Sequence, residues 1–80
     1  MEKYIKTYST VDKVTGKPVD YRTFLKSSDA YRMCDELEKQ GYISKKFKSY
    51  KHAWYSIYEG DNDIVVVYWG DGNDNYTRPY

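Results

Sequence analysis

The spacing of hydrophobic positions changes along the chain, and the first part of it is typical of two strands. Residues 3–11 are dense in Tyr, Ile, Thr and Val, which strands favour. Residues 19–25 alternate in polarity, which places every second side chain on the same face of a strand. Gly16 and Pro18 lie between the two segments, where turn residues are expected. The pattern predicts a β-hairpin over residues 1–26.

Residues 27–41 have the periodicity of an amphipathic helix. Ala30, Met33, Cys34 and Leu37 recur at i, i+3, i+4 and i+7, which gives a single apolar stripe. Ser27 or Ser28 can cap the start, and Gly41 stands where a glycine commonly ends a helix. We expect one helix with one buried face.

The chain after Gly41 reads as a β-meander over residues 42–70. The candidate strands are Tyr42–Ser49, Ala53–Tyr58 and Ile64–Trp69, with a strong turn signal at residues 59–63. Residues 50–52 form either a turn or a continuation of the first strand. Residues 71–80 are expected to be a tail that frays at its end.

These elements predict the α+β class for a single domain of residues 1–80, because so short a chain has room for one core. The expected architecture is an antiparallel sheet of four to five strands. Its element order is ββαβββ or ββαββ, and one amphipathic helix packs across one face.

The segment Ile64–Trp69 departs from the alternation of a sheet with one covered face. Ile64, Val66 and Tyr68 point to one side, while Val65, Val67 and Trp69 point to the other. One helix covers only one of these sides. Two alternatives account for the second: the hairpin, the tail and nearby tyrosine rings cover it, or it is a contact surface for a second copy or another protein.

Aromatic residues make up 19% of the chain, and eleven of them are tyrosines. Large rings with a polar end are enriched at the energetic centres of protein interfaces. With the two-sided strand, this tyrosine-rich composition predicts a protein-binding module, and a homodimer is a further possibility. The candidate partner-binding residues are Trp54, Tyr55, Tyr58, Tyr68 and Trp69.

The net charge of +1 hides a segregation of charges. Residues 41–58 hold four lysines and no acid, and residues 59–75 hold five acids and no base. Lysines interleaved with rings over residues 45–55 suit single-stranded nucleic acid, which is the alternative function. Against it, neighbouring acids can neutralise these lysines. The candidate nucleic-acid residues are Lys45, Lys46, Lys48, Tyr50, Lys51 and His52.

Candidate catalytic and metal-binding groups are few, so we expect a non-enzymatic protein with no cofactor and no metal. Cys34 lies on the apolar stripe of the helix, where a buried and inert thiol is expected. His52 has no carboxylate beside it in sequence to orient its ring. Residues 71–75 resemble the start of a calcium loop, but Tyr76 occupies the position where an EF-hand needs glycine.

Composition also bears on the setting. No run of 18 apolar residues and no apolar signal core is present, and the single cysteine fits a reducing compartment, so we expect a cytoplasmic protein. Ten lysines against three arginines, with many tyrosines, are typical of AT-rich genomes such as those of many low-GC bacteria and their phages. The leading hypothesis is an inhibitor or regulator of a host protein, such as an anti-defence factor, encoded by a phage or mobile element.

Overall fold

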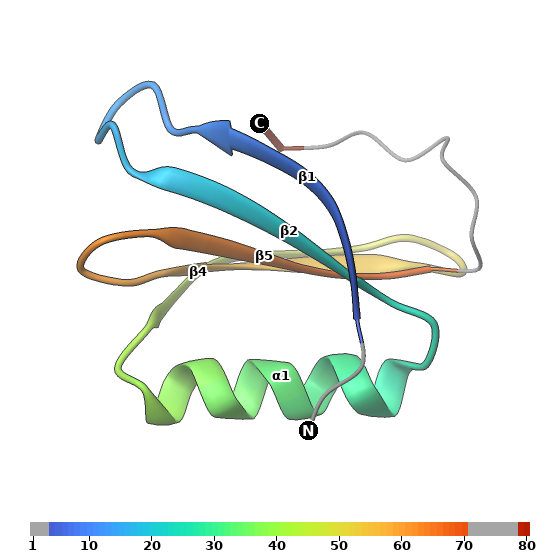
Figure 1. The fold of residues 1–80 in the computed structure, drawn as a ribbon. Coiled ribbons are helices and arrows are strands. Elements are labelled where there is room, and N and C mark those ends of the chain that lie inside the picture. The colour runs from blue at the N-terminus through green and yellow to red at the C-terminus, as the bar shows by residue number, and fades with distance from the viewer. Residues whose placement is uncertain (1–3, 71–78) are drawn as a thin grey trace.

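A computed structural model describes residues 4–70 and 79–80 of the chain, and its element order is ββαβββ, one of the two orders expected (Figure 1). The predicted tail at 71–80 lies outside the described residues except for its last two. The α+β class and the single domain with one helix across the sheet are confirmed. The elements are β1 (Ile5–Val11), β2 (Pro18–Phe24), α1 (Ser27–Lys39), β3 (Ile43–Ser49), β4 (Trp54–Glu59) and β5 (Ile64–Trp69).

The predicted hairpin is formed by β1 and β2, which pair antiparallel. Its turn is closed by the backbone hydrogen bond from Gly16 N–H to the Asp12 carbonyl, at 2.8 Å. The Asp12 carboxylate accepts hydrogen bonds from the backbone and the hydroxyl of Thr15, at 3.0 and 2.5 Å. Gly16 has a φ of +77°, a conformation that L side chains rarely adopt, so the turn needs glycine here.

The helix α1 buries the predicted stripe, namely Ala30, Met33, Cys34 and Leu37. It ends in a Schellman motif: Gly41 N–H bonds the Glu38 carbonyl, and Tyr42 N–H bonds the Leu37 carbonyl. Gly41 has the positive φ, +96°, that this ending requires. The start differs from the prediction, because the N-cap residue is Lys26 and no side chain caps the helix.

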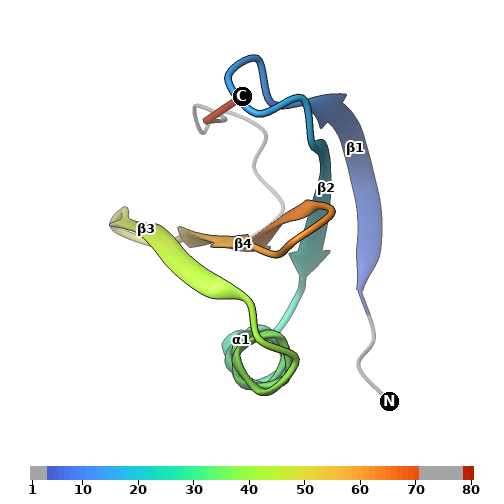
Figure 2. The same ribbon diagram turned by 90° about the vertical axis from the view of Figure 1, so that its left-hand side faces the viewer.

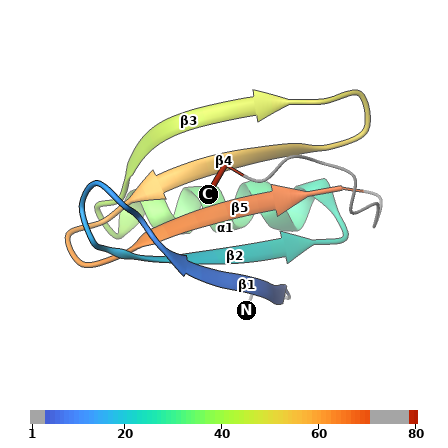
Figure 3. The same ribbon diagram turned by 90° about the horizontal axis from the view of Figure 1, so that it is seen from above.

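The sheet is mixed rather than wholly antiparallel, with strand order β1-β2-β5-β4-β3 (Figure 3). Three of the pairings are antiparallel as expected, but β2 and β5 pair in parallel. The physical reason is the helix, which runs back across the sheet to the end at which β2 began. The next strand, β3, therefore runs parallel to β2, at the edge of the sheet opposite β1. The meander then fills the gap and places β5, the predicted central strand, beside β2.

Both faces of β5 are buried in the chain. Val65 and Val67 face α1 and pack with Phe24 and Leu37. Ile64 and Val66 lie on the opposite face, called here the second face, in a cluster with Tyr21. The sheet bends so that the β1–β2 hairpin stands up beside the second face (Figure 2). This curvature lets a small chain build two apolar clusters on one sheet.

The remaining sequence predictions concern turns and a membrane span. Residues 50–52 form a turn, closed by a backbone bond from Tyr50 N–H to the Ala53 carbonyl at 2.6 Å. The turn predicted at residues 59–63 joins β4 to β5. Among the described residues, no helix has the length and apolar character needed to cross a membrane.

Candidate partner-binding surface

Three of the five aromatic residues predicted as partner anchors are core residues. Trp54 and Tyr58 face α1, and Tyr55 lies on the second face. Each exposes at most 5% of its surface. The Tyr58 hydroxyl donates a hydrogen bond to the Glu38 carboxylate at 3.2 Å. Rings buried this deeply stabilise the fold and cannot contact a partner without local unfolding.

The other two predicted anchors, Tyr68 and Trp69, are half-buried at the end of β5. Tyr68 stacks on Tyr55, with ring centres 6.1 Å apart and an interplanar angle of 15°. The Trp69 ring centre lies 6.4 Å from that of Trp54. Both rings therefore extend the two core clusters to the end of the sheet and leave only part of their surface accessible.

Of the two alternatives for the second face of β5, cover by the chain itself is the correct one. Tyr21, on the hairpin strand β2, is fully buried against this face. Its hydroxyl accepts a hydrogen bond from the backbone N–H of Tyr80 at 3.0 Å. The two-sided strand therefore no longer supports the existence of a partner, and an interaction surface has to be found elsewhere.

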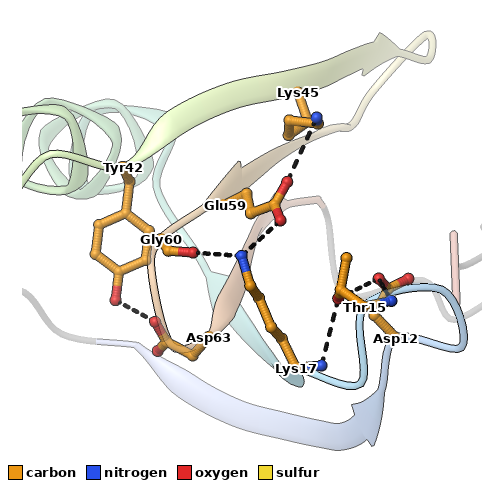
Figure 4. A network of polar contacts seen from close by, with 8 residues as sticks. All are labelled: Asp12, Thr15, Lys17, Tyr42, Lys45, Glu59, Gly60 and Asp63. Atoms are coloured by element: carbon orange, nitrogen blue, oxygen red, sulfur yellow. Dashed lines mark hydrogen bonds and ion pairs between the residues drawn. The ribbon is translucent and has the colours of Figure 1, made fainter.

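An ion-pair network ties the hairpin turn to the end of β4 (Figure 4). The Lys17 ammonium donates to Glu59 Oε2 at 2.7 Å and to the Gly60 carbonyl at 2.9 Å. Lys45 Nζ lies 3.4 Å from Glu59 Oε1. The hydrogen bond from Lys17, with the charge of Lys45, lowers the pKa of Glu59 below its usual value. The Glu59 carboxylate therefore forms ion pairs with both Lys17 and Lys45.

A second polar contact fixes the corner between α1 and β3. The Tyr42 hydroxyl donates to Asp63 Oδ1 at 2.6 Å, which joins this corner to the β4–β5 turn (Figure 4). That hydrogen bond, with some burial, raises the pKa of Tyr42 to about 12. A Cβ at Gly60 would lie 2.7 Å from the Tyr42 ring, so the turn approaches the ring as closely as glycine allows.

The strand β3 forms one edge of the sheet and is exposed along its whole length. The helix α1 packs against β2, β4 and β5, while β3 lies beyond it (Figure 3). All seven residues of β3 are exposed, and they include Ile43 at 67% and Phe47 at 55%. Its outer edge pairs with no described strand, so its backbone donors and acceptors are available to another chain.

An exposed aromatic group, called here the aromatic step, lies where α1 and β3 approach β4. It consists of Tyr31 on α1 and Phe47 on β3, with the buried Trp54 between them. The ring centres of Tyr31 and Phe47 lie 4.9 and 5.6 Å from that of Trp54. Tyr31 and Phe47 are each 55% exposed. Rings that rest on a fixed neighbour lose little conformational freedom on binding, which favours them as anchors.

The lysines of β3 are on the face opposite the aromatic step. Lys46 and Lys48 are paired in register with Ile57 and Tyr55, which belong to the second face. Neither lysine has an ion pair within the described part of the chain, whereas Lys45 is paired with Glu59. Lys48 Nζ lies 5.6 Å from the centre of the half-buried Tyr50 ring. Lys51 and His52 are exposed in the following turn.

Groups suited to covalent or metal chemistry are not gathered into a site in the described part of the chain. The Cys34 thiol is buried against the sheet, and burial raises its pKa, which keeps it protonated and unreactive. Among the described His, Cys, Asp and Glu residues, no three lie close enough together to hold a metal ion. The exposed edge of β3 is the better candidate for function.

Sequence reasoning missed Tyr31 and Phe47 as candidate contacts. A signal for Phe47 was present, because it is an isolated ring in a strand that otherwise consists mainly of lysine and serine. Tyr31 adjoins the apolar stripe of α1 without belonging to it. Strand order decides which rings are buried on β4 and which are exposed rings that pack against it. A single sequence does not give that order.

Comparison with known proteins does not add to this picture. No protein family model matches the chain, and neither does any curated protein or solved structure. The function has to be argued from the surface that the fold presents.

Proposed function

We propose that this chain is a non-enzymatic protein-binding module that contacts its partner through the edge of β3 and the aromatic step. The observation that carries the proposal is the strand β3, which is exposed along its whole length and whose Phe47 ring, with Tyr31 of α1, lies on the buried Trp54. Free strand edges are normally shortened, covered or paired, since they recruit other chains. An edge that is left open and pairs regularly along residues 46–49 in so small a domain is suited to an interaction.

The setting we propose is the cytoplasm of a host cell, where the module inhibits or regulates a host protein, such as a defence factor, on behalf of a phage or mobile element. The lysine-rich, tyrosine-rich composition and the small size of the chain support this setting. The anchors we assign are Tyr31 and Phe47, with Tyr68 and Trp69 as further half-buried contacts.

The alternative, a single-stranded nucleic-acid binder, has weaker geometric support. Nucleic acid needs cations for its phosphates and rings for its bases along one groove. On β3 the exposed ring, Phe47, and the lysines Lys46 and Lys48 lie on opposite faces. Tyr50 is near Lys48 on the lysine face, but it is half-buried. A protein strand fits better, since its side chains alternate between faces.

The test is retention of a protein from a lysate of the host cell by the immobilised chain and by two variants. Tyr31→Ser/Phe47→Ser removes both exposed rings, and Val14→Ser removes an apolar side chain that is 92% exposed in the hairpin turn. We expect wild type and Val14→Ser to retain the same stoichiometric protein. The double variant should lose it, because an anchor ring contributes about 2 kcal/mol or more.

Circular dichroism checks that the double variant is folded, which is expected because both substituted side chains are exposed. If wild type retains no stoichiometric protein, or if the double variant retains it as well as wild type does, the proposed function is wrong.

A further inference from the structure

The lysines and the ring of β3 alternate in a way that specifies the chemistry of a binding strand. Lys46 and Lys48 project on the second face, and Phe47 between them projects toward the aromatic step. Side chains at i and i+2 of a strand are about 7 Å apart and on one face. A strand added beside β3 would present its own side chains with the same period.

From this alternation we infer that β3 binds an extended segment of a partner protein in which acidic and apolar residues alternate. This inference rests on the proposed function and deepens it. The segment adds a strand to the sheet by backbone hydrogen bonds. Its acids lie beside Lys46 and Lys48, and its apolar side chains lie beside Phe47 and Tyr31.

Charge complementarity is the reason for choosing an acidic occupant. Lys46 and Lys48 have no ion pair in the described chain, while Glu59, across from the start of β3, is held by Lys17 and Lys45. Lysines on an edge strand commonly prevent pairing with other edges. They repel a second copy of β3, which would bring lysines against lysines, yet they attract a strand that carries acids at the same spacing.

The bulge in β3 sets the extent of this surface. The pairing of β3 with β4 shifts between Ser44 and Lys46, whereas Lys46 to Ser49 pair regularly. A bulge bends its strand and interrupts the ladder. The added segment therefore pairs along residues 46–49, which is long enough for two acids with one apolar residue between them.

The experiment titrates the isotopically labelled full chain with synthetic peptides and follows its backbone amide signals by NMR. The probe is acetyl-Glu-Val-Glu-Tyr-Glu-Val-Glu-amide. One control has the same composition in blocks, acetyl-Glu-Glu-Glu-Glu-Val-Tyr-Val-amide, and a second has Gln in place of every Glu. A third is an oligothymidylate. We expect the probe to shift the amide signals of β3, and to bind more tightly than every control.

Substitutions in the chain locate the contact. We expect Lys46→Gln/Lys48→Gln to weaken binding of the probe roughly threefold to tenfold, a loss within the range for two exposed ion pairs. Lys51→Gln, which changes an exposed lysine outside the strand, should leave affinity within about twofold of wild type. Methylating the backbone nitrogens of the Glu residues in one probe, and of the Val and Tyr residues in another, should abolish binding of only one of the two, because alternate N–H groups of a strand face the same edge.

Several outcomes would overturn the inference: equal binding of the block peptide, signal changes confined to other elements, binding of the oligothymidylate alone, or a dimer by light scattering whose β3 amides are protected from hydrogen exchange. The proposed function is judged separately. If a cellular protein is retained through Tyr31 and Phe47 but the probe does not compete with it, this inference fails and the proposed function stands. If the probe binds at β3 but no cellular protein is retained, β3 accepts an acidic strand as inferred, while the proposed contact with a host protein is wrong.

Discussion

The closure of the second face by the chain itself makes a quantitative prediction about two neighbouring valines. Val66 and Val67 are adjacent on β5, point to opposite faces, and are both 0% exposed. Alanine at either position removes two methyl groups, which costs about 1.6 kcal/mol in transfer free energy plus a cavity contribution. We therefore expect each variant to lose about 2–3 kcal/mol of unfolding free energy.

The assay is urea unfolding of the purified protein, followed by tryptophan fluorescence and circular dichroism. A chain of 80 residues is expected to have an unfolding free energy of about 4–12 kcal/mol, so the loss is large but measurable. Val14→Ala, in the exposed turn, is the matched control and should change the free energy by less than about 0.5 kcal/mol. If Val66→Ala leaves too little folded protein, Ile64→Val probes the same face at about 0.5–1.5 kcal/mol.

The result that would refute this reasoning is an asymmetry between the two valines. If the second face were open in the isolated chain, Val66→Ala would cost less than about 1 kcal/mol, the span of strand propensity. Val67→Ala, beneath the helix, would still cost about 2–3 kcal/mol. Such a difference at unchanged denaturant dependence would show that the second face is not closed by the chain itself.

Two polar contacts and one missing helix cap make predictions of their own. Asp63→Asn should bring the pKa of Tyr42 from about 12 back toward 10, as measured by NMR of its ring. The raised pKa stabilises the fold below pH 10, and this stabilisation is lost as pH rises through about 12. An unchanged titration of Tyr42 in the variant would contradict the assigned hydrogen bond. Glu59→Gln should lower the unfolding free energy at pH 7 and flatten its decline in acid. The lowered pKa of Glu59 stabilises the fold above the usual pKa of 4.5, and this stabilisation is lost as pH falls through the folded pKa. Urea unfolding from pH 7 to ~pH 3 checks this, and identical pH profiles of variant and wild type would contradict the ion pair of Glu59 with Lys17. Lys26→Ser should raise the unfolding free energy by about 0.5–1 kcal/mol by supplying the missing N-cap, and an unchanged or lower melting temperature in calorimetry would argue against that N-cap assignment.

Local signals in the sequence predicted the elements of this fold well. The i, i+3, i+4, i+7 stripe from Ala30 to Leu37 is the face that α1 buries, and Gly41 ends the helix as expected. The exception is Lys26, because a serine at the start of a helix predicts a cap only if its own backbone takes the N-cap conformation. Here the N-cap conformation is adopted one residue earlier.

The pairing of strands that are distant in sequence could not be predicted from local sequence patterns. The parallel contact of β2 with β5 joins segments separated by α1, β3 and β4, and no short motif encodes it. This pairing places Tyr21 in the cluster of the second face, so the cover of Val66 could not be deduced from β5 alone.

The candidate contact surface depended on the same unknown order. Trp54, Tyr55 and Tyr58 are aromatic in sequence and thus plausible anchors, yet β4 lies between two strands and is covered on both faces. Phe47 lies only one strand further out, on the edge strand β3, and is 55% exposed. Aromatic composition indicates that contact area is available, and strand order decides which rings present it to solvent.

The most direct test of the proposed contact surface is site-specific photo-crosslinking in the host cell. A photoreactive phenylalanine analogue replaces Phe47 on β3 in one variant and Val14 in the hairpin turn in another; both positions are exposed. We predict a single covalent adduct with a host protein from position 47 and none from position 14. Adducts from position 14 alone, or no adduct from either position in host cells that express the variants, would contradict the assignment of β3 as the binding edge.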